Sequence, residues 1–335
     1  MIGLRHGLIK GARISALGVS IPERVITNEE LSRTLDTSDE WIRSRTGIRE
    51  RRVCAPEQAT SDLAVLAAAD LLARNGDDAR DIDLVISTSL VPDMIFPASA
   101  SIIAHRIGAQ NAGAFDVQAG CTGFIYGLAC ATAFVASDIY EKVLVTGAEA
   151  LSKSLDWTDR STCVLFGDGA GAVLVTPSEN GSIFSFDLGN DGSGADKLNL
   201  PAGGARLPAS PETVAGRQHF LKMNGREVYR FATRKVVESC QKTLADAEMT
   251  PADVDLFVPH QANIRIIDYV SEKLGFRDEQ VFANLDRYGN TSCASIPLCL
   301  HEAEQNGRLK TGDSLLMVGF GAGLTWGSCL TKWEL

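Results

Sequence analysis

The chain has 335 residues, of which 45% are hydrophobic and 22% are charged, values typical of a globular protein with a sizeable core. At about 100–200 residues per domain, this length predicts two domains or one large domain with two lobes. The net charge of −10, from 42 acidic and 32 basic residues, argues against general nucleic-acid binding, which usually needs a basic surface.

The sequence has no run of about 18 apolar residues, so no membrane span is expected. The N-terminal segment MIGLRHGLIKGARIS lacks the apolar core of a signal peptide. The eight cysteines are too sparse for a disulfide scaffold, and none has the spacing of a zinc site. We therefore expect a cytoplasmic protein with reduced thiols and without a metal ion.

The first half of the chain alternates helix patterns with strand patterns. An amphipathic helix pattern at 61–76 leads into DIDLVI at 81–86, a polar lead-in followed by a buried strand. A second strand pattern, AFDVQAGCTG at 114–123, runs into a nearly all-apolar segment that suits a fully buried helix. A third, KVLVTGAEAL at 142–151, is a buried strand that ends in small residues. This alternation predicts an α/β protein with parallel or mixed sheets covered by helices.

The second half repeats these landmarks in the same order. DVDLFV at 253–258 echoes the first strand and also follows an amphipathic helix pattern. FANLDRYGNTS at 282–292 echoes the second landmark as a short strand, a glycine and a helix, and DSLLMVGFGAG at 313–323 echoes the third. Chance similarity between hydrophobic strands is the alternative, and three ordered matches make it the weaker one. A segment near 180–220, rich in Gly, Pro, Ser and Asn, predicts a long connecting loop.

We therefore predict two duplicated α/β halves, residues 1–180 and residues 181–335. Equivalent strand ends from such halves can converge on one central site. Cys121 lies at such an end in the first half, and His260 and Asn290 lie at such ends in the second.

Cys121 has a setting that favours reactivity. It lies between Gly120 and Gly123, where a strand is expected to end and a helix to begin. Backbone N–H groups and the positive end of the helix dipole should lower the pKa of the thiol there. The usual alternative is a buried and inert thiol. We expect this inert state for the other seven cysteines: Cys54, Cys130, Cys163, Cys240, Cys293, Cys299 and Cys329.

His260 and Asn290 are weak signals when each is taken alone. His260 follows a predicted strand and precedes a predicted helix, which gives the rigidity and access that a catalytic imidazole needs, but a lone histidine there is more often structural. Asn290 alone is an ordinary turn residue beside a glycine. A cysteine with distant histidine and asparagine partners is nevertheless a known nucleophile arrangement.

The motifs QAGCTGF, VPHQANIRII and YGNTSCASIP, in this order, resemble the Cys–His–Asn site of the β-ketoacyl-acyl carrier protein synthase III family in the thiolase superfamily. The segments TSDEWIRSRTGIRERR, DWTDRSTCVLFGDGAGAVLV and GFGAGLTWGS also resemble this family. The resemblance extends from about Ala12 to the end and leaves Met1–Gly11 as an unmatched extension without an assigned function. It implies a thiolase-like fold, with two duplicated α/β halves in a layered αβαβα arrangement.

By this resemblance, Cys121 takes an acyl group from acyl-CoA as a thioester. The acyl-enzyme then condenses with malonyl-acyl carrier protein, releases CO2 and forms a 3-ketoacyl product, which initiates fatty-acid synthesis. His260 Nε2 and the Asn290 amide would donate hydrogen bonds to the enolate that decarboxylation leaves. The backbone N–H groups of Cys121 and Ala322 would form a second oxyanion site, although the family usually has glycine at the position of Ala322. Acyl-CoA is a substrate here, and no cofactor is implied.

The resemblance also implies a CoA site at Trp41, Arg45 and Arg160. An aromatic plane and a guanidinium can enclose an adenine, and arginines can pair with phosphates. The alternative for Trp41 and Arg45 is a surface helix with ordinary charge pairs.

Two further surfaces follow from the resemblance. Acyl carrier proteins are acidic, so an acidic enzyme needs a local basic patch to dock one. Arg265 matches the docking arginine of the family, and Arg230 and Lys273 are its expected companions, with a solvated charged face as the alternative. Phe96 matches a loop that in the family crosses a dimer interface and closes the acyl pocket of the partner, so a homodimer is implied.

Two rival functions stay open at this point. One is a specialised synthase III-like acyltransferase or condensing enzyme of polyketide or other secondary metabolism. The other is a non-catalytic subunit that binds acyl chains or a carrier protein, and the presence of Cys121 argues against it. The sequence leaves the acyl chain of the primer open.

Overall fold

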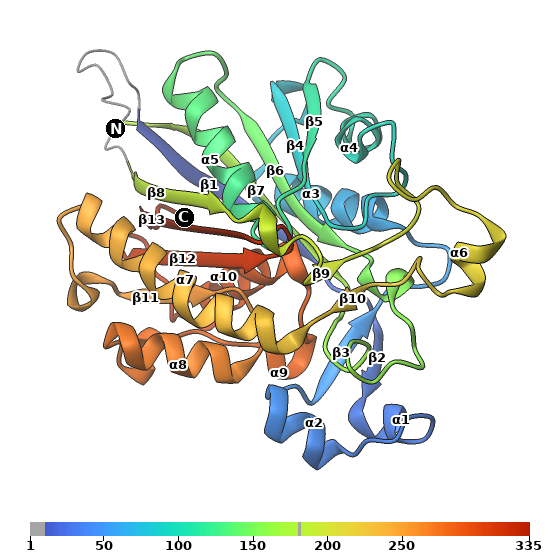
Figure 1. Ribbon diagram of the computed structural model, residues 1–335. Helices are drawn as coiled ribbons and strands as arrows, with labels where there is room; N and C mark the ends of the chain where they lie inside the picture. The colour runs from blue at the N-terminus through green and yellow to red at the C-terminus, as the bar shows by residue number, and fades with distance from the viewer. Residues whose placement is uncertain (1–10, 180–181) are drawn as a thin grey trace.

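The computed structural model describes residues 11–179 and 182–335 (Figure 1). The N-terminal extension Met1–Gly11 therefore lies outside the described residues, apart from Gly11. The first sheet has five strands, with β4 parallel to β5 and β6, and β7 antiparallel to β6 and β1. In spatial order these strands are β1 (Gly11–Ser20), β7 (Gly169–Ser178), β6 (Val143–Glu149), β4 (Leu84–Thr88) and β5 (Gly113–Val117).

The second sheet has four strands and comes from the second half of the chain. Its spatial order is β8 (Ile183–Asn190), β13 (Thr325–Lys332), β12 (Ser314–Gly321) and β11 (Leu256–Pro259). Strands β11 and β12 are parallel, whereas β13 is antiparallel to both of its neighbours. Since β8 begins at Ile183, the expected connecting loop near 180–220 starts with a strand, and its irregular part begins only after Asn190.

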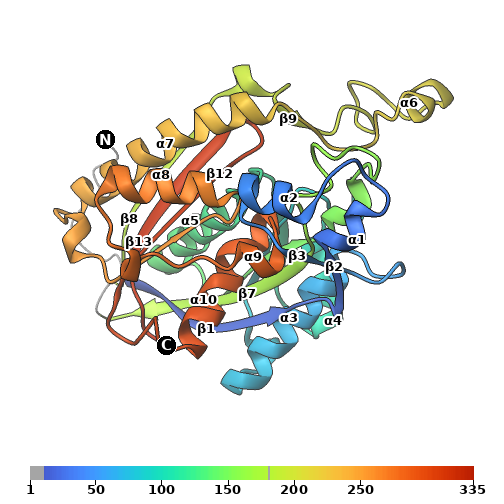
Figure 2. The same ribbon diagram turned by 90° about the horizontal axis from the view of Figure 1, so that it is seen from below.

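Helices cover both sheets and fill the space between them (Figures 1 and 2). The two central helices are α5 (Gly123–Ala136) and α10 (Ser295–Gln305). The outer helices are α3 (Thr60–Asn75) and α4 (Ser99–Ile107) on the first sheet, with α7 (Gly225–Asp246) and α8 (Ile264–Leu274) on the second. The central position of α5 follows from its composition, because a helix that is apolar all round is stable only when it is buried. The predicted layered αβαβα fold is confirmed.

The two sheets share one order of strands, except at one edge. Strands β1, β7, β6 and β4 have counterparts in β8, β13, β12 and β11, but β5 has none. The expected strand at the start of 282–292 is wrong: Val281 makes a single bridge to Phe257, and the following residues form the short helix α9 (Leu285–Tyr288). The side chain of Gln261 explains this, because its Oε1 accepts hydrogen bonds from the backbone N–H groups of Asn284 and Leu285 at 3.0 and 3.3 Å. These donors are satisfied without a neighbouring strand.

The remaining elements lie outside the two sheets and the helices that cover them (Figure 1). A small hairpin and two short helices form a projection next to α8, and a second two-stranded ribbon with one short helix follows β8. These elements are β2 (Arg24–Thr27), α1 (Asn28–Ser32), α2 (Asp39–Thr46), β3 (Glu50–Val53), β9 (Leu198–Asn199), α6 (Pro211–Ala215) and β10 (Lys222–Met223). Single 3₁₀ turns occur at 79–81, 151–154, 192–194, 251–253, 278–280 and 292–294.

Within residues 11–179 and 182–335, the structure has no helix that combines the length and the apolarity needed to cross a membrane. The same residues contain no group of three or more His, Cys, Asp or Glu side chains that could hold a metal ion.

Candidate active site

Cys121 lies in the turn between β5 and α5, two residues before the helix begins. The backbone at the end of β12 and in the turn after it, Gly321 and Ala322, lies directly against this turn. A Cβ atom added to Gly321 would come within 2.4 Å of Cys121 N, and one added to Gly120 would come within 2.6 Å of Ala322 N. Gly120 also has a φ of +58°, in the region that favours glycine. Only glycine at these two positions lets the two backbone segments approach so closely.

Because of this close approach, the backbone N–H groups of Cys121 and Ala322 lie near each other. The predicted second oxyanion site requires such proximity. Ala322 fits there despite being an alanine. Among the described residues other than glycine, a positive φ occurs only at Asp138, Arg217, Glu248 and Ser292. Ala322 therefore has an ordinary backbone conformation that tolerates a side chain.

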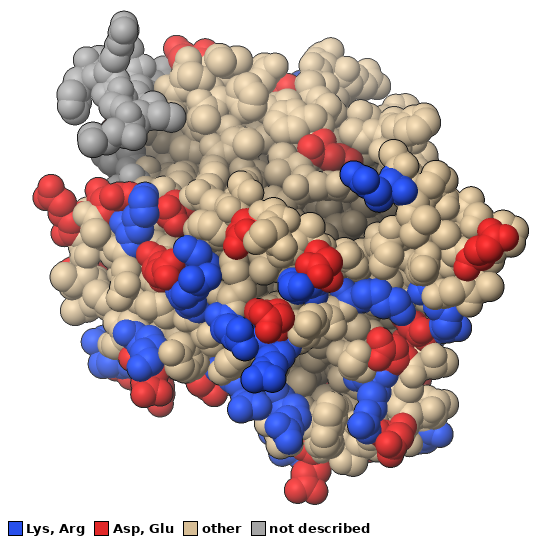
Figure 3. All heavy atoms as spheres, viewed as in Figure 1, with Lys and Arg blue, Asp and Glu red and all other residues tan. Residues whose placement is uncertain are grey.

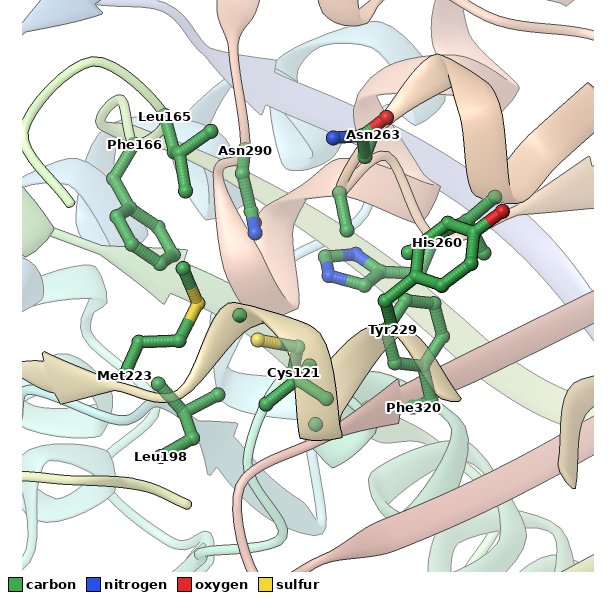
Figure 4. A pocket seen from close by; sticks show the side chains of 15 residues that line it. Cys121, Leu165, Phe166, Leu198, Met223, Tyr229, His260, Asn263, Asn290 and Phe320 are labelled. Carbon is green, nitrogen blue, oxygen red and sulfur yellow. The ribbon is translucent and has the colours of Figure 1, made fainter. Parts of the chain in front are cut away.

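His260 directly follows β11, and its backbone N–H donates to Val318 O at 2.8 Å, which fixes the residue to β12. The imidazole is 1% exposed, and its Nδ1 lies 2.7 Å from Ser295 Oγ. Burial lowers the pKa of His260 to about 3, so the ring is neutral at physiological pH. Its Nε2 has no hydrogen-bond partner within the described part of the chain. Figure 4 shows the ring lying close to Cys121 in the pocket.

Asn290 is held by a short bridge to the segment before β7. Its backbone N–H donates to Leu165 O at 2.8 Å, and its carbonyl accepts from Gly167 N at 3.0 Å. Its side-chain Oδ1 accepts a hydrogen bond from Ser292 N at 2.8 Å. This bond orients the amide so that the Nδ2 donor faces the cavity, as Figure 4 shows.

Cys121, His260 and Asn290, from three distant segments, line one pocket. The rest of the lining is mostly apolar: Leu165, Phe166, Leu198, Met223, Gly225, Val228, Tyr229, Ala262, Asn263, Ile266, Phe320 and Gly321. A pocket of this kind suits an acyl chain whose reacting carbonyl meets a few well-placed polar groups.

The expected low pKa of Cys121 is wrong. Burial raises the pKa of the thiol to about 12, and the nearby Glu149 carboxyl adds to this effect, while a hydrogen bond with Ser292 opposes it. The loss of solvation therefore outweighs the backbone donors at the start of α5. The thiol is protonated at neutral pH, and its proton has to leave as the sulfur attacks.

Two buried charged residues near the site were missed by the sequence analysis. The first is Arg51 on β3, whose guanidinium is completely buried. It donates to Asn28 Oδ1 at 2.9 Å and to Val164 O at 2.7 Å. Burial lowers the pKa of Arg51 to about 10, so the guanidinium is still charged at neutral pH. Through Val164 it fixes the segment that pairs with Asn290.

The second is Glu149, the last residue of β6, which is completely buried. Its carboxyl accepts from Leu90 N at 2.8 Å, Ser89 Oγ at 3.1 Å and Val91 N at 3.3 Å. Burial raises the pKa of Glu149 to about 7. One acidic residue inside the apolar run KVLVTGAEAL was the available signal, because an acid is rarely buried without a structural or chemical reason.

The raised pKa of Glu149 predicts a stability that falls as pH rises. Between its ordinary value of 4.5 and about 7, the folded chain keeps a proton that the unfolded chain has released. At about 1.36 kcal/mol per pKa unit, the free energy of unfolding falls by about 3 kcal/mol over this pH range. We expect Glu149→Gln to gain about 3 kcal/mol of unfolding free energy relative to wild type between pH 4.5 and 8. Urea unfolding across this range, with the exposed Glu238→Gln as control, measures the gain. If the unfolding free energies of wild type and Glu149→Gln depend on pH in the same way, the prediction is contradicted.

Two of the predicted CoA residues, Trp41 and Arg45, lie on the projection beside α8, and the third, Arg160, reaches Trp41 from the segment before β7. Trp41 and Arg45 are one turn apart on α2, and the Arg160 guanidinium lies 5.4 Å from the centroid of the Trp41 ring. Arg160 is held there by a hydrogen bond to Asp36 O and an ion pair with the Asp36 carboxylate at 3.3 Å. Trp41 is 38% exposed, so its side chain is accessible to a ligand.

The predicted carrier-docking residues lie on two neighbouring helices. Arg265 is in the first turn of α8, and Lys273 is in its last turn, with Nζ 5.6 Å from the centroid of the Tyr269 ring. Arg230 is on α7 and forms an exposed ion pair with Glu227 at 3.6 Å. Figure 3 shows basic side chains gathered over α7, α8 and α2, with acidic side chains between them.

Phe96 does not line the pocket of its own chain. It lies in the loop before α4 and is 82% exposed, and the adjacent Ile95 is 77% exposed. Two large apolar side chains at the tip of one loop form a surface that is typical of a contact with another protein.

Comparison with known proteins agrees with this geometry. Residues 115–192 match the family model of 3-oxoacyl-[acyl-carrier-protein (ACP)] synthase III, and residues 244–333 match that of its C-terminal part. The chain is 49% identical, over 97% of its length and 100% of the relative, to beta-ketoacyl-[acyl-carrier-protein] synthase III of Natranaerobius thermophilus. It is 51% identical to the protein of the same name from Symbiobacterium thermophilum, over 97% of this chain and 99% of the relative.

Solved structures of similar sequence have the same fold over nearly the whole chain. The synthase III from Thermus thermophilus aligns with a TM-score of 0.90 at 48% identity, covering 96% of this chain and 99% of that one. The priming beta-ketosynthase of the R1128 polyketide pathway aligns with a TM-score of 0.91 at 36% identity, covering 99% of each chain.

Proposed function

The chain belongs to the 3-oxoacyl-[acyl-carrier-protein] synthase III family, and from this membership we propose that it condenses an acyl group from acyl-CoA with malonyl-acyl carrier protein. The observation that carries the proposal is the convergence of the Cys121 thiol, His260 Nε2 and Asn290 Nδ2 on one apolar pocket. The chemistry is a decarboxylative Claisen condensation through an acyl-cysteine, and it initiates fatty-acid synthesis.

In the first half-reaction, Cys121 Sγ attacks the thioester carbonyl of acyl-CoA. The new bond joins Sγ to the carbonyl carbon, the bond to the CoA sulfur breaks, and the proton of the thiol leaves with CoA as its free thiol. The tetrahedral oxyanion is stabilised by the backbone N–H groups of Cys121 and Ala322. A sulfur nucleophile suits this step because it also leaves readily from the resulting thioester.

In the second half-reaction, malonyl-acyl carrier protein loses CO2, and the electron pair of the broken bond forms an enolate on the remaining thioester. Asn290 Nδ2 and His260 Nε2–H donate hydrogen bonds to the enolate oxygen. The enolate carbon attacks the acyl-cysteine, the Cys121 thiolate leaves and takes up a proton, and the 3-ketoacyl product stays on the carrier protein. An amide and a buried neutral imidazole are suitable donors because neither changes charge at working pH.

The alternative of a specialised enzyme of polyketide or secondary metabolism is not favoured. The similarity to proteins named as synthase III reaches 49–51% identity, compared with 36% for the priming beta-ketosynthase. A non-catalytic subunit would have no need for a buried thiol in a pocket that two hydrogen-bond donors also line.

The proposed condensation is tested by measuring both products in one reaction. With acyl-CoA and malonyl-acyl carrier protein, wild type should release one CO2 for each 3-ketoacyl-carrier protein formed. The Cys121→Ala variant, which folds around a smaller side chain, should form no 3-ketoacyl product. Acyl transfer without CO2 release would instead support a non-decarboxylating acyltransferase.

The surroundings of the pocket fit the expected substrates and partners. Trp41 and Arg160 would enclose the adenine of CoA, and Arg45 would meet its phosphates. Phe96, exposed in the single chain, would cover the acyl pocket of a second copy in a homodimer. The reaction needs no resident cofactor, and we place it in the cytoplasm.

Carrier docking is tested by reversing one charge on the proposed patch. Arg265→Glu should raise the KM for malonyl-acyl carrier protein by about tenfold, because one reversed charge at a docking surface weakens an acidic partner by roughly 1–2 kcal/mol. Acyl loading from CoA should stay at the wild-type rate. Lys310→Glu makes the same change in charge on an exposed loop at the other end of β12 from the pocket, and it controls for net charge. If both variants bind the carrier equally well, Arg265 does not belong to the docking surface.

A further inference from the structure

Ser295 is the first residue of α10, and its side chain serves no purpose in its own helix. Serine is common at helix starts because its hydroxyl can cap backbone N–H groups. The N-cap of α10, however, is Ala294, and no side-chain cap is present. The Ser295 hydroxyl is turned instead to the His260 ring, with Oγ 2.7 Å from Nδ1. Ser295 is 2% exposed, so this contact is shielded from water.

The contact can be made in two ways, since a neutral imidazole carries one proton on either nitrogen. In one arrangement, the Ser295 O–H donates to Nδ1, and the proton of the ring is on Nε2. In the other, Nδ1–H donates to Ser295 Oγ, and Nε2 carries only a lone pair. The Nε2 atom faces the pocket in both cases, so the choice decides whether the pocket receives a donor or an acceptor.

The location of the unpaired donor favours the first arrangement. The described residues offer the Ser295 hydroxyl no hydrogen-bond partner other than His260 Nδ1. If Nδ1–H donated to Oγ, the hydroxyl proton would be left buried without an acceptor, which is unfavourable. If the hydroxyl donates to Nδ1, the unpaired donor is instead Nε2–H, and because His260 lines the pocket, a substrate there can accept a hydrogen bond from it.

The helix favours a neutral ring in either arrangement. Ser295 lies at the N-terminal end of α10, an 11-residue helix, where the positive end of the dipole disfavours a doubly protonated ring. The low pKa of His260 agrees with a ring that stays neutral.

We propose that Ser295 is a positioning residue that holds His260 as the Nε2–H tautomer, so that the ring is a hydrogen-bond donor and not the base that deprotonates Cys121. This inference rests on the proposed condensation, in which a donor is needed for the enolate. It separates the two half-reactions: condensation depends on Ser295, whereas acyl loading of Cys121 does not.

The direct test is the tautomer of His260 in the wild-type protein. The chain has five histidines, and ¹⁵N-histidine labelling with the His260→Ala variant identifies the signals of this ring. Long-range ¹H–¹⁵N correlation should give a protonated Nε2 and an unprotonated Nδ1 at pH 7. A protonated Nδ1 in the wild-type protein would overturn the proposal without any variant and whether or not condensation is observed.

The kinetic test compares Ser295→Ala with Ser295→Thr. Without the hydroxyl, the ring is free to take both tautomers, and the condensation rate should fall by about ten- to hundredfold. Acyl loading, followed by protein mass, should stay within about twofold of wild type. Ser295→Thr keeps the hydroxyl and should recover most of the condensation rate. Equal losses of loading and condensation in Ser295→Ala would assign the residue a merely structural role.

Discussion

Asn290→Asp is expected to lower the rate of condensation by about 10²- to 10³-fold and to leave acyl loading of Cys121 intact. Aspartate has the same size as asparagine, and one of its oxygens can still accept the hydrogen bond from Ser292 N. The other oxygen then faces the pocket as an anion where the amide placed a donor. An enolate formed beside it is repelled instead of being stabilised.

Two rates measured on the same sample separate these effects. Loading is followed from acyl-CoA alone, and condensation is followed after malonyl-acyl carrier protein is added to the preloaded enzyme. Asn306→Asp makes the same chemical change at the exposed C-terminal end of α10 and should leave both rates near wild type. A variant at position 290 that condenses at the wild-type rate would exclude the amide as an enolate donor.

Gly321→Ala is expected to slow both half-reactions by about 10²- to 10³-fold. The added Cβ would lie 2.4 Å from Cys121 N and 3.0 Å from Cys121 Cβ, and backbone atoms there cannot move without separating the two segments. Separation misplaces the N–H groups of Cys121 and Ala322, and removal of such donors lowers rates by about 10²- to 10³-fold. We also expect a loss of about 1–3 kcal/mol of unfolding free energy from the overpacking.

Loading kinetics and urea unfolding measure the two consequences of this substitution. Gly204→Ala is the matched control, because a Cβ atom at Gly204 meets no atom within 4 Å and the residue has no unusual φ. Normal loading by Gly321→Ala would show that the close approach of the two backbones is not needed for the oxyanion site.

The layered fold could be predicted from the sequence because buried strands leave a strong local pattern. DIDLVI and DVDLFV each lead into a buried parallel strand, as expected, and in both cases the motif begins at the last residue of a 3₁₀ turn. The pattern failed at 282–292, where the side chain of Gln261 satisfies the backbone that a strand would have used. A side chain that takes over the hydrogen bonds of a neighbouring strand depends on tertiary contacts, and no local sequence pattern predicts it.

The residues of the site could be named from the sequence, but their protonation could not. The position of Cys121 before a helix predicted a low pKa, whereas complete burial raises it. The ring of His260 is neutral for the same reason. Burial is a property of the assembled sheets and helices, so its effect on a pKa becomes visible only with the structure. Ser295 and Glu149 were missed because their partners, His260 and the backbone at 90–91, are distant in the sequence.

The mass of the intact protein after incubation with a panel of acyl-CoAs tests the central claim most directly. Wild type should gain the mass of one acyl group, Cys121→Ala should gain none, and the acyl-CoA that loads best will identify the class of primer. A gain of mass that persists in Cys121→Ala, or the absence of loading from every acyl-CoA, would contradict the assignment of Cys121 as the nucleophile of a CoA-primed condensation.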